Sequence, residues 1–471
     1  MNNLGISLKD QNSTIDQKTQ APNQLATSSL ETSKPKSQIL VLDGVRAVAC
    51  LSVLLYHMSF IAGTKGIWGP VYNTHDVSGI IAFFAASFAY FGEEGVILFF
   101  ILSGFLLFLP YAKALLFESP WPSWRRFYLR RFFRILPGYF VALFLIALLF
   151  HPEFLQSSHW HDLWLFLSFS MNKNLSEQLN GPFWTLAVEF QFYLLLPIIA
   201  WLCSLIVRRG TLHWRVLKLT LCLLAMVAWG LLTRYWGIYI ANTPQLDFLI
   251  PHTASIALIP FIYSDTGKFS EVFAVGMLLC MIYTYTQYAP SGERWRTRMY
   301  RLSPLILTVG LALLLFLSLW HFYFIDMNPL HYAKHPKSYI VSSFLDPGIP
   351  AIVSRYWPEW QPLGCAIGYG LCLWALLYGS VRLKRPIEWS VLRWVALISF
   401  SLYMWHLPFL YVFRDIILPN IRQQGWNPLV QYGAFWCWIL LIIIPVSAML
   451  YRWIEQPGIR LGERFIRRLE G

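Results

Sequence analysis

The sequence has few charged residues. Asp, Glu, Lys and Arg make up 13% of the 471 residues, whereas hydrophobic residues make up 56% and aromatic residues 17%. An ordinary soluble protein carries about 25% charged residues. The shortage of charge therefore excludes an ordinary soluble domain and predicts a polytopic membrane protein.

Paired cysteines are also missing. The seven cysteines occur singly, nearly all in apolar runs, and none forms a CxxC motif. This pattern is typical of cysteines that pack as small hydrophobic residues rather than as disulfides or metal ligands. Two histidine-rich stretches, HWHD at 159–162 and HYAKHP at 331–336, have ligand-like spacing but no convincing third ligand on a helix. We therefore predict no metal site.

Several functional motifs do not occur. The sequence has no glycine-rich phosphate loop and no GxSxG nucleophile elbow, so ATP-driven transport and the α/β-hydrolase fold have no local support. Residues 1–37 are polar and lack the apolar region and cleavage site of a signal peptide. We predict that they form a disordered cytoplasmic tail.

Long apolar runs, by contrast, are abundant. A helix that crosses the bilayer needs about 20 apolar residues. Ten runs qualify, at 42–62, 91–112, 134–151, 183–207, 216–236, 269–289, 303–324, 363–381, 394–413 and 430–451. Shorter stretches at 79–90 and 162–170 are expected to be interfacial or re-entrant. If one more stretch crosses the membrane, the number of spans is eleven. The predicted fold is an all-α transmembrane helical bundle over 38–455, followed by a short basic cytoplasmic tail at 456–471.

The positions of the basic residues predict the orientation. If the N-terminus is cytoplasmic, 26 of the 37 lysines and arginines fall on the cytoplasmic side and 8 on the outer side. Both termini are therefore expected in the cytoplasm. The formal net charge of +13 is then explained by topology and by contacts with lipid headgroups, not by nucleic acid. The long outer loops 152–182 and 325–362 are rich in aromatic residues, which suits a carbohydrate but is equally typical of an interfacial aromatic belt.

The first predicted span contains ionisable residues. Arg46 and His57 are eleven residues apart, so they share one helical face and lie about 16 Å apart along the axis. Asp43 and Arg46 can simply extend to the interface, and His57 can be a hydrogen-bonded core residue. Because ionisable groups inside a membrane are costly, a catalytic or transport role is the alternative.

Other polar residues occur in or beside the later spans. An arginine-rich stretch, WRRFYLRRFFR, is expected to form a short cytoplasmic loop that either sets topology or binds phosphates; it holds Arg125, Arg126, Arg130, Arg131 and Arg134. Glu189 interrupts the fourth span, and Ser399, Tyr403 and His406 share one face of the ninth. Together these residues predict a polar cavity inside the bundle.

The chain resembles the integral-membrane acyltransferase family three, of the O-antigen O-acetyltransferase type. Six stretches look like the family's motifs in the family's order: LDGVRAVACLSVLLYH, GVILFFILSGFLL, RRFFRILPGYF, FWTLAVEF, SFSLYMWHLP and RWIEQPGIR. The resemblance runs from about residue 38 to 460. One departure is GEEGV, in which Glu93 and Glu94 stand where the family is usually rich in glycine.

The resemblance implies an enzyme of the plasma (inner) membrane that transfers an acyl group from cytoplasmic acyl-CoA, with no metal. The acyl group is expected to be acetyl and the acceptor a hydroxyl of a carbohydrate or glycolipid at the outer side. By position, His57 is the expected catalytic histidine and Arg46 its companion. The residues expected to bind acyl-CoA are Arg130, Arg131, Arg134 and Ser103. Those expected in the remaining polar cavity are His406, Tyr403 and Trp184.

The sequence leaves the mechanism open. His57 is either a general base that Glu189 orients or a transient carrier of the acyl group. Two other classes of protein also fit the polar residues: a transporter or flippase that relays protons or substrate, and a scaffold in which His57 is dispensable. The oligomeric state is not predicted.

Overall fold

The computed structural model describes residues 39–64, 77–241, 251–263, 267–322 and 355–470. The chain divides into two units, Met1–Ile39 and Leu40–Gly471, and all described helices belong to the second. The predicted tail at 1–37 and the histidine-rich stretch at 331–336 lie outside the described residues.

All the regular elements in the described ranges are helices, which confirms the all-α prediction. The longer ones are α1 (Leu40–Thr64), α2 (Val77–Tyr90), α3 (Gly95–Phe117), α4 (Trp124–Phe150), α7 (Phe183–Val207), α8 (Leu212–Tyr235), α9 (His252–Ile262), α10 (Ser270–Tyr288), α11 (Gly292–Trp320), α14 (Trp357–Tyr378), α16 (Ser390–Val412), α18 (Pro428–Trp438) and α20 (Gln456–Glu470). The shorter ones are η1 (Phe91–Glu94), η2 (Pro152–Leu155), η3 (Ser157–His159), α5 (Trp160–Leu167), α6 (Lys173–Leu179), η4 (Trp236–Ile240), α15 (Val381–Lys384), η8 (Phe413–Ile417), α17 (Leu418–Gln423), η9 (Ile439–Ile443), α19 (Ile444–Leu450) and η10 (Tyr451–Glu455).

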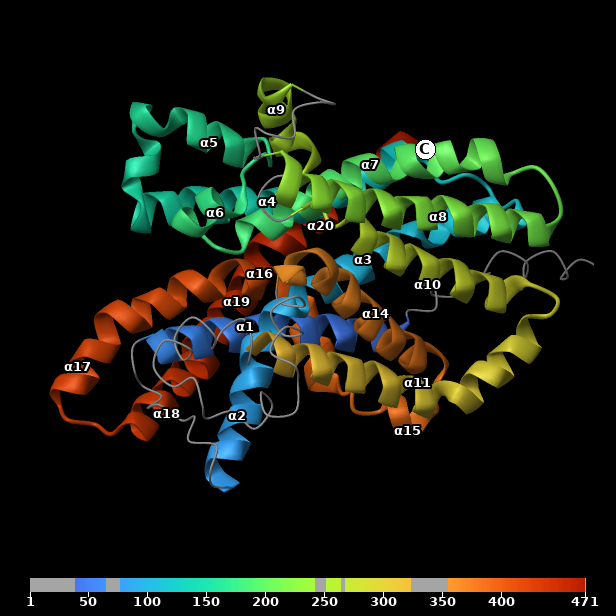
Figure 1. The fold of residues 1–471 in the computed structure, drawn as a ribbon. Helices are drawn as coiled ribbons and strands as arrows, with labels where there is room; N and C mark the ends of the chain where they lie inside the picture. Colours follow the sequence, from blue (N-terminus) through green and yellow to red (C-terminus); the bar gives the residue numbers. More distant parts are fainter. Residues whose placement is uncertain (1–38, 65–76, 242–250, 264–266, 323–354, 471) are drawn as a thin grey trace, which may run out of the picture. The chain divides into compact units, whose positions relative to one another are not determined.

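Nine helical runs in the described part of the chain are long and apolar enough to cross a membrane. They correspond to nine of the ten predicted spans, so the polytopic bundle is confirmed. The tenth predicted span, 269–289, is the helix α10, which has 19 residues and packs against α3, α8 and α14. Figure 1 shows α10 running beside α8 and α11. The two shorter apolar stretches form the helices α2 and α5.

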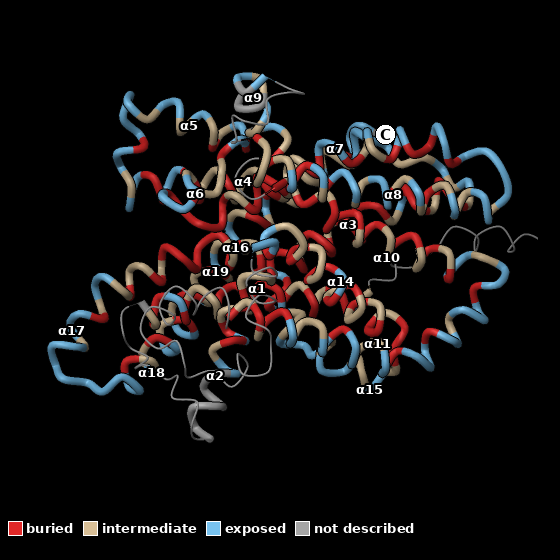
Figure 2. Tube along the Cα trace, in the orientation of Figure 1, coloured by how far each residue is buried: buried red, intermediate tan, exposed pale blue. Residues whose placement is uncertain are grey.

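Three spans form the buried centre of the bundle. The most apolar window is 72% buried in the run that contains α3, 67% buried in the run that begins with α16 and 56% buried in α1. The window in the run of α8 is only 17% buried, which is typical of a helix that faces lipid. Figure 2 shows the buried segments concentrated along α1, α3, α10 and α16. Polar residues on the central helices are therefore held away from lipid.

Two helices begin ten or eleven residues earlier than predicted. The arginine-rich stretch expected as a loop is the start of α4, where the side chain of Ser123 caps the helix by accepting a hydrogen bond from the backbone N–H of Arg126. The basic segment 292–301, which precedes the predicted span 303–324, is the start of α11. Arginine favours helices, and apolar residues recur among these arginines, so each helix continues beyond the hydrocarbon. The loop prediction was wrong because the apolar run was taken as the whole helix.

Three π-helical segments lie between Phe413 and Glu455. Their bounds are those of η8, η9 and η10. A proline follows the end of each by two residues: Pro419, Pro445 and Pro457. Proline has no N–H to donate to the carbonyl four residues earlier, and the helix adjusts by widening locally. The segment η10 thereby ends on the buried Glu455, which accepts a hydrogen bond from Ser401 of α16.

Two helices of more than ten residues were not predicted. The short helix α9 lies in an outer loop of the predicted topology, and α20 occupies residues expected to form a short basic tail. The helix α20 packs on α4, with Gly458 and Gly462 close to Phe133.

Candidate active site

A first cavity, the arginine cavity, lies among α1, α3, α4, α7 and α16 and has a volume of about 260 Å³. Its polar lining residues are Arg46, Ser103, Arg131, Arg134, Thr185, Glu189, Tyr193, Ser399 and Tyr403. Each of the five helices contributes at least one of them. The cavity is therefore assembled by the tertiary fold and not by one contiguous motif.

Positive charge predominates in the arginine cavity. The lining contains three guanidinium groups and one carboxylate, that of Glu189, which accepts a hydrogen bond from Ser103. Arg46 is 3.8 Å from Asp43 one turn earlier in α1. The guanidinium of Arg131 lies over the ring of Tyr193, 5.9 Å from its centroid. Such a chamber suits a ligand with several negative charges.

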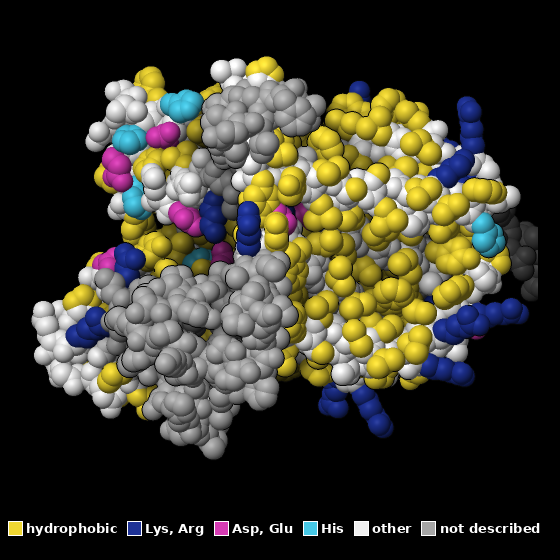
Figure 3. Space-filling view, in the orientation of Figure 1, with side chains coloured by type: hydrophobic (Ala, Val, Ile, Leu, Met, Phe, Trp, Pro, Cys, Tyr) yellow, Lys and Arg dark blue, Asp and Glu magenta, His cyan; other side chains and the backbone are white. Residues whose placement is uncertain are grey.

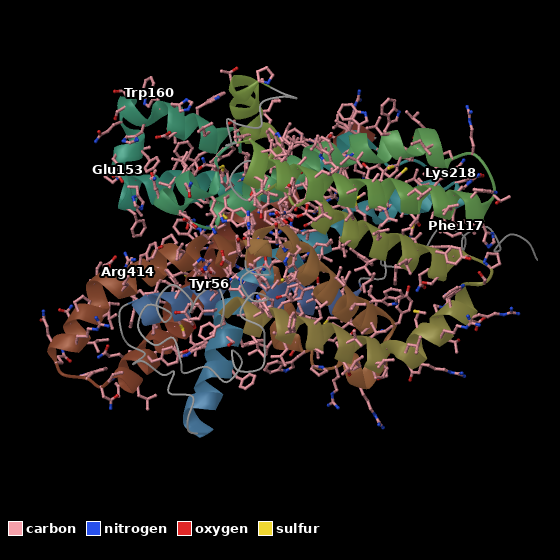
Figure 4. All side chains as sticks on the ribbon, viewed as in Figure 1. Tyr56, Phe117, Glu153, Trp160, Lys218 and Arg414 are labelled. Carbon is pink, nitrogen blue, oxygen red and sulfur yellow. The ribbon has the colours of Figure 1, made fainter. Side chains whose placement is uncertain are left out.

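A second cavity, the histidine cavity, has a volume of about 280 Å³. Its lining includes Tyr56, His57, Glu93, Lys173, Glu177, Trp184, Thr185, Tyr403 and Tyr411. Figure 3 shows acidic, basic and histidine side chains gathered where the face is hollowed between α6 and α16. In Figure 4, Tyr56 lies on α1 beside this hollow.

His57 contacts His406 of α16. The Nε2 atom of His406 is 3.1 Å from Nδ1 of His57, and the same Nδ1 is 3.0 Å from the carbonyl oxygen of Val53. The Nδ1 atom of His406 is 3.1 Å from the carbonyl oxygen of Leu402 and 2.8 Å from that of Tyr403. Carbonyl oxygens only accept hydrogen bonds, so both Nδ1 atoms carry a proton.

This pattern fixes the tautomer of both rings. With its proton on Nδ1, a neutral His406 presents an unprotonated Nε2, which accepts the hydrogen bond from Nδ1 of His57. The remaining nitrogen of His57, Nε2, then has a free lone pair, and the His57 side chain lines the histidine cavity. His406 is 1% exposed, so the contact is shielded from solvent. The arrangement leaves His57 ready to take a proton or attack an electrophile.

Lys173 forms the charged edge of the histidine cavity. Its Nζ is 3.4 Å from Glu93 and 3.6 Å from Glu177, and it lies 5.8 Å from the centroid of the Trp184 ring. Burial by itself would lower the pKa of Lys173, but the two carboxylates more than offset it and the pKa is raised. Lys173 is therefore a fixed positive charge beside an aromatic face.

The structure brings together most of the residues predicted from the sequence. The arginine cavity holds Arg46, Ser103, Arg131, Arg134 and Glu189; the histidine cavity holds His57 and Trp184; Tyr403 lines both. His406 lies directly behind His57. Arg130, also expected to bind acyl-CoA, is exposed on α4 and does not line the arginine cavity.

The partner of His57 differs from the expected one. His406 contacts it, whereas Glu189 lines the arginine cavity and pairs with Ser103. Sequence analysis did not single out Lys173 or Thr185. Apart from histidine, Lys173 is the one basic residue of the predicted outer loop 152–182, and this could have marked it as a candidate functional residue. Among the described residues, no three His, Cys, Asp or Glu side chains gather as metal ligands.

Comparisons with known proteins identify the family of the chain. The model of the acyltransferase family three, described as an acyltransferase domain, matches residues 39–452, and the chain belongs to this family. It is 23% identical to the peptidoglycan O-acetyltransferase OatA of Listeria monocytogenes over 446 residues, which cover 88% of this chain and 55% of that protein. It is 24% identical to the putative peptidoglycan O-acetyltransferase YrhL of Bacillus subtilis over 455 residues, 88% of this chain and 54% of that protein. The chain thus spans about half the length of these relatives. No solved structure matches it.

Proposed function

We propose that the protein is a membrane O-acyltransferase that moves an acyl group, most simply acetyl, from cytoplasmic acyl-CoA to a hydroxyl at the outer side of the plasma (inner) membrane. The observation that carries the proposal is the pair of adjoining cavities, one lined by three arginines and the other by His57, whose contacts place its proton on Nδ1. Membership of the acyltransferase family supports the same reaction class.

The arginine cavity is the proposed site of the donor. Phosphate groups of coenzyme A make charge-assisted hydrogen bonds with guanidinium groups, and Arg131 and Arg134 lie near the start of α4, which the predicted topology places toward the cytoplasm. Arg46 lines the same space from α1. The pantetheine arm then extends from these phosphates toward the boundary with the histidine cavity.

His57 is the proposed reacting side chain. As a general base, its Nε2 takes the proton of the acceptor hydroxyl while the hydroxyl oxygen attacks the thioester carbonyl carbon. When the carbon–sulfur bond breaks, the same proton passes to the sulfur, so that an ester and free coenzyme A leave. As an acyl carrier, Nε2 instead attacks the thioester carbonyl carbon, the carbon–sulfur bond breaks and coenzyme A leaves as a thiolate. The acceptor oxygen then attacks the acyl carbon, the carbon–nitrogen bond breaks, and the hydroxyl proton passes to the thiolate. Both routes need the lone pair that His406 and Val53 leave on Nε2.

The acceptor is proposed to be a carbohydrate or glycolipid. The two relatives named above are described as peptidoglycan O-acetyltransferases, and peptidoglycan is a glycan polymer. The lining of the histidine cavity is compatible with a sugar, because it combines the aromatic rings of Tyr56, Trp184 and Tyr411 with hydrogen-bonding groups on Glu93 and Glu177.

The direct test is calorimetric titration of the purified protein with acetyl-CoA, with free coenzyme A and acetyl phosphate in parallel. We expect binding of acetyl-CoA and coenzyme A, and much weaker binding of acetyl phosphate, which lacks the nucleotide phosphates. A folded protein that binds neither coenzyme would support a transporter or scaffold instead.

A further inference from the structure

The arginine cavity and the histidine cavity meet at a small boundary. Three residues line both of them: Val96, Thr185 and Tyr403. They come from three helices, α3, α7 and α16. An acyl group that moves from one cavity toward His57 has to pass these three side chains.

A hydrogen bond links α7 to α16 at this boundary. The hydroxyl oxygens of Thr185 and Tyr403 are 2.6 Å apart. Thr185 Oγ1 is also 2.9 Å from the carbonyl oxygen of Pro182, which only accepts, so the Thr185 proton points to Pro182. The Tyr403 hydroxyl is therefore the donor and Thr185 the acceptor between the two helices.

The surroundings hold the pair in place. Thr185 is only 5% exposed, and the ring of Phe99 packs edge-on against that of Tyr403 with 5.6 Å between their centroids. The backbone carbonyl of Tyr403 also accepts a hydrogen bond from Nδ1 of His406. The boundary is thus continuous with the shell that orients His57.

We propose that Thr185 and Tyr403 form a closed wall between the donor and acceptor cavities, which makes transfer to a hydroxyl win over transfer to water. This inference rests on the proposed function. A thioester that reaches His57 without an acceptor can be hydrolysed, in which water adds to the carbonyl carbon, the carbon–sulfur bond breaks, and a carboxylic acid and free coenzyme A form. The wall limits that loss because it opens only when the Tyr403–Thr185 hydrogen bond is exchanged for contacts with the bound substrates.

The test measures release of free coenzyme A from acetyl-CoA by purified protein, with no acceptor present, using a thiol reagent. Tyr403→Phe removes the donor and Thr185→Val removes the acceptor with little change in shape. Each should raise the release of coenzyme A without acceptor by about threefold to tenfold. Loss of one hydrogen bond would increase the fraction of molecules with an open boundary by about that factor. The double variant should release coenzyme A no faster than the single variants, because both remove the same bond.

Tyr378→Phe is the matched control, since the Tyr378 hydroxyl makes the same kind of contact, 2.6 Å from that of Thr286, between α14 and α10, and Tyr378 lines neither cavity. It should leave the rate of release unchanged. If both boundary variants bind acetyl-CoA but release coenzyme A no faster than the wild type, the proposed wall is wrong. Additive effects in the double variant would also overturn it. If the wild-type protein binds no acetyl-CoA, the proposed function is wrong, and the proposed wall, which depends on that function, is wrong as well.

Discussion

At the scale of single residues, the reactivity of His57 depends on which of its ring nitrogens is free. Two acceptors, the Val53 carbonyl and His406 Nε2, share the proton on Nδ1. The carbonyls of Leu402 and Tyr403 hold His406 in the tautomer that makes it an acceptor. His406 is therefore a positioning residue that acts through His57.

Substitution of His406 tests this role. In His406→Gln the amide oxygen reaches about as far as Nε2 and can accept the same hydrogen bond, whereas His406→Leu cannot. We expect His406→Leu to lower kcat about tenfold, a loss of one hydrogen bond, and His406→Gln to retain most of the activity. Acetyl-CoA binding should be equal in both. If the two variants lose the same activity, His406 does not act by accepting this hydrogen bond.

The arginines test the donor site at the same scale. Arg131→Gln and Arg134→Gln should each weaken acetyl-CoA binding by more than tenfold, because a charge-assisted hydrogen bond contributes roughly 1.5–3 kcal/mol. Arg130 is exposed outside the cavity, so Arg130→Gln should weaken binding less. Arg301→Gln, an exposed change on α11, is the charge-matched control and should have no effect. Equal affinities in all variants would reduce the arginines to a topology signal.

At the scale of helices, close backbone contact between α3 and α10 anchors the centre of the bundle. A methyl group on Gly104 would lie 2.4 Å from the backbone oxygen of Phe273, and one on Gly276 would lie 2.2 Å from that of Ile101. Both contacts are with backbone, which cannot rotate away. Small residues therefore allow these two helices to touch, as is common between membrane helices.

Gly104→Ala and Gly276→Ala should each destabilise the fold by about 1–3 kcal/mol, since the helices must separate. Thermal unfolding in detergent measures the change. Gly433 of α18 has no atom within 4 Å of an added methyl group, so Gly433→Ala is the control. It should leave stability unchanged or raise it slightly, because alanine favours a helix more than glycine does. A similar loss of stability in all three variants would show that the backbone contact between α3 and α10 does not contribute more to stability than an exposed glycine position does.

The elements also show how far sequence reasoning reaches. The span at 183–207 was predicted with the bounds that α7 has, because an apolar run flanked by polar turns marks both ends. The start of α4 was missed because hydropathy cannot detect a helix that continues as an arginine-rich stretch. The contact between His57 and His406 joins residues 349 positions apart, so no local pattern could pair them. The family resemblance supplied candidates, and the fold supplied their partners.

At the scale of the whole helical unit, the predicted cytoplasmic and outer segments lie at opposite ends of the helices, as the charge pattern predicts. Figure 4 shows Phe117 and Lys218, both next to predicted cytoplasmic segments, at one end of the helices. Glu153, Trp160 and Arg414, all in predicted outer segments, lie toward the opposite end. This separation is what alternating crossings require.

A reporter fused after the last residue tests the orientation. A reporter that is active only outside the cytoplasm should stay silent, and one that is active only inside should give a signal. We expect this result because 26 lysines and arginines lie on the predicted cytoplasmic side and 8 on the outer side. Strong activity of the outside reporter would contradict the topology and exchange the sides assigned to the two cavities.

Inverted membrane vesicles that contain the cell's own acceptor test directly whether His57 transfers acetyl across the membrane. Acetyl-CoA with a labelled acetyl group is added to the exposed cytoplasmic face, and alkali-labile label inside the vesicles is measured. We expect such label to accumulate with the wild-type protein, and His57→Ala and His57→Gln to reduce it by about 10²–10⁴-fold while still binding acetyl-CoA. Near-normal transfer by either variant would show that His57 is not the reacting residue, and label confined to the cytoplasmic face would show that transfer does not cross the membrane.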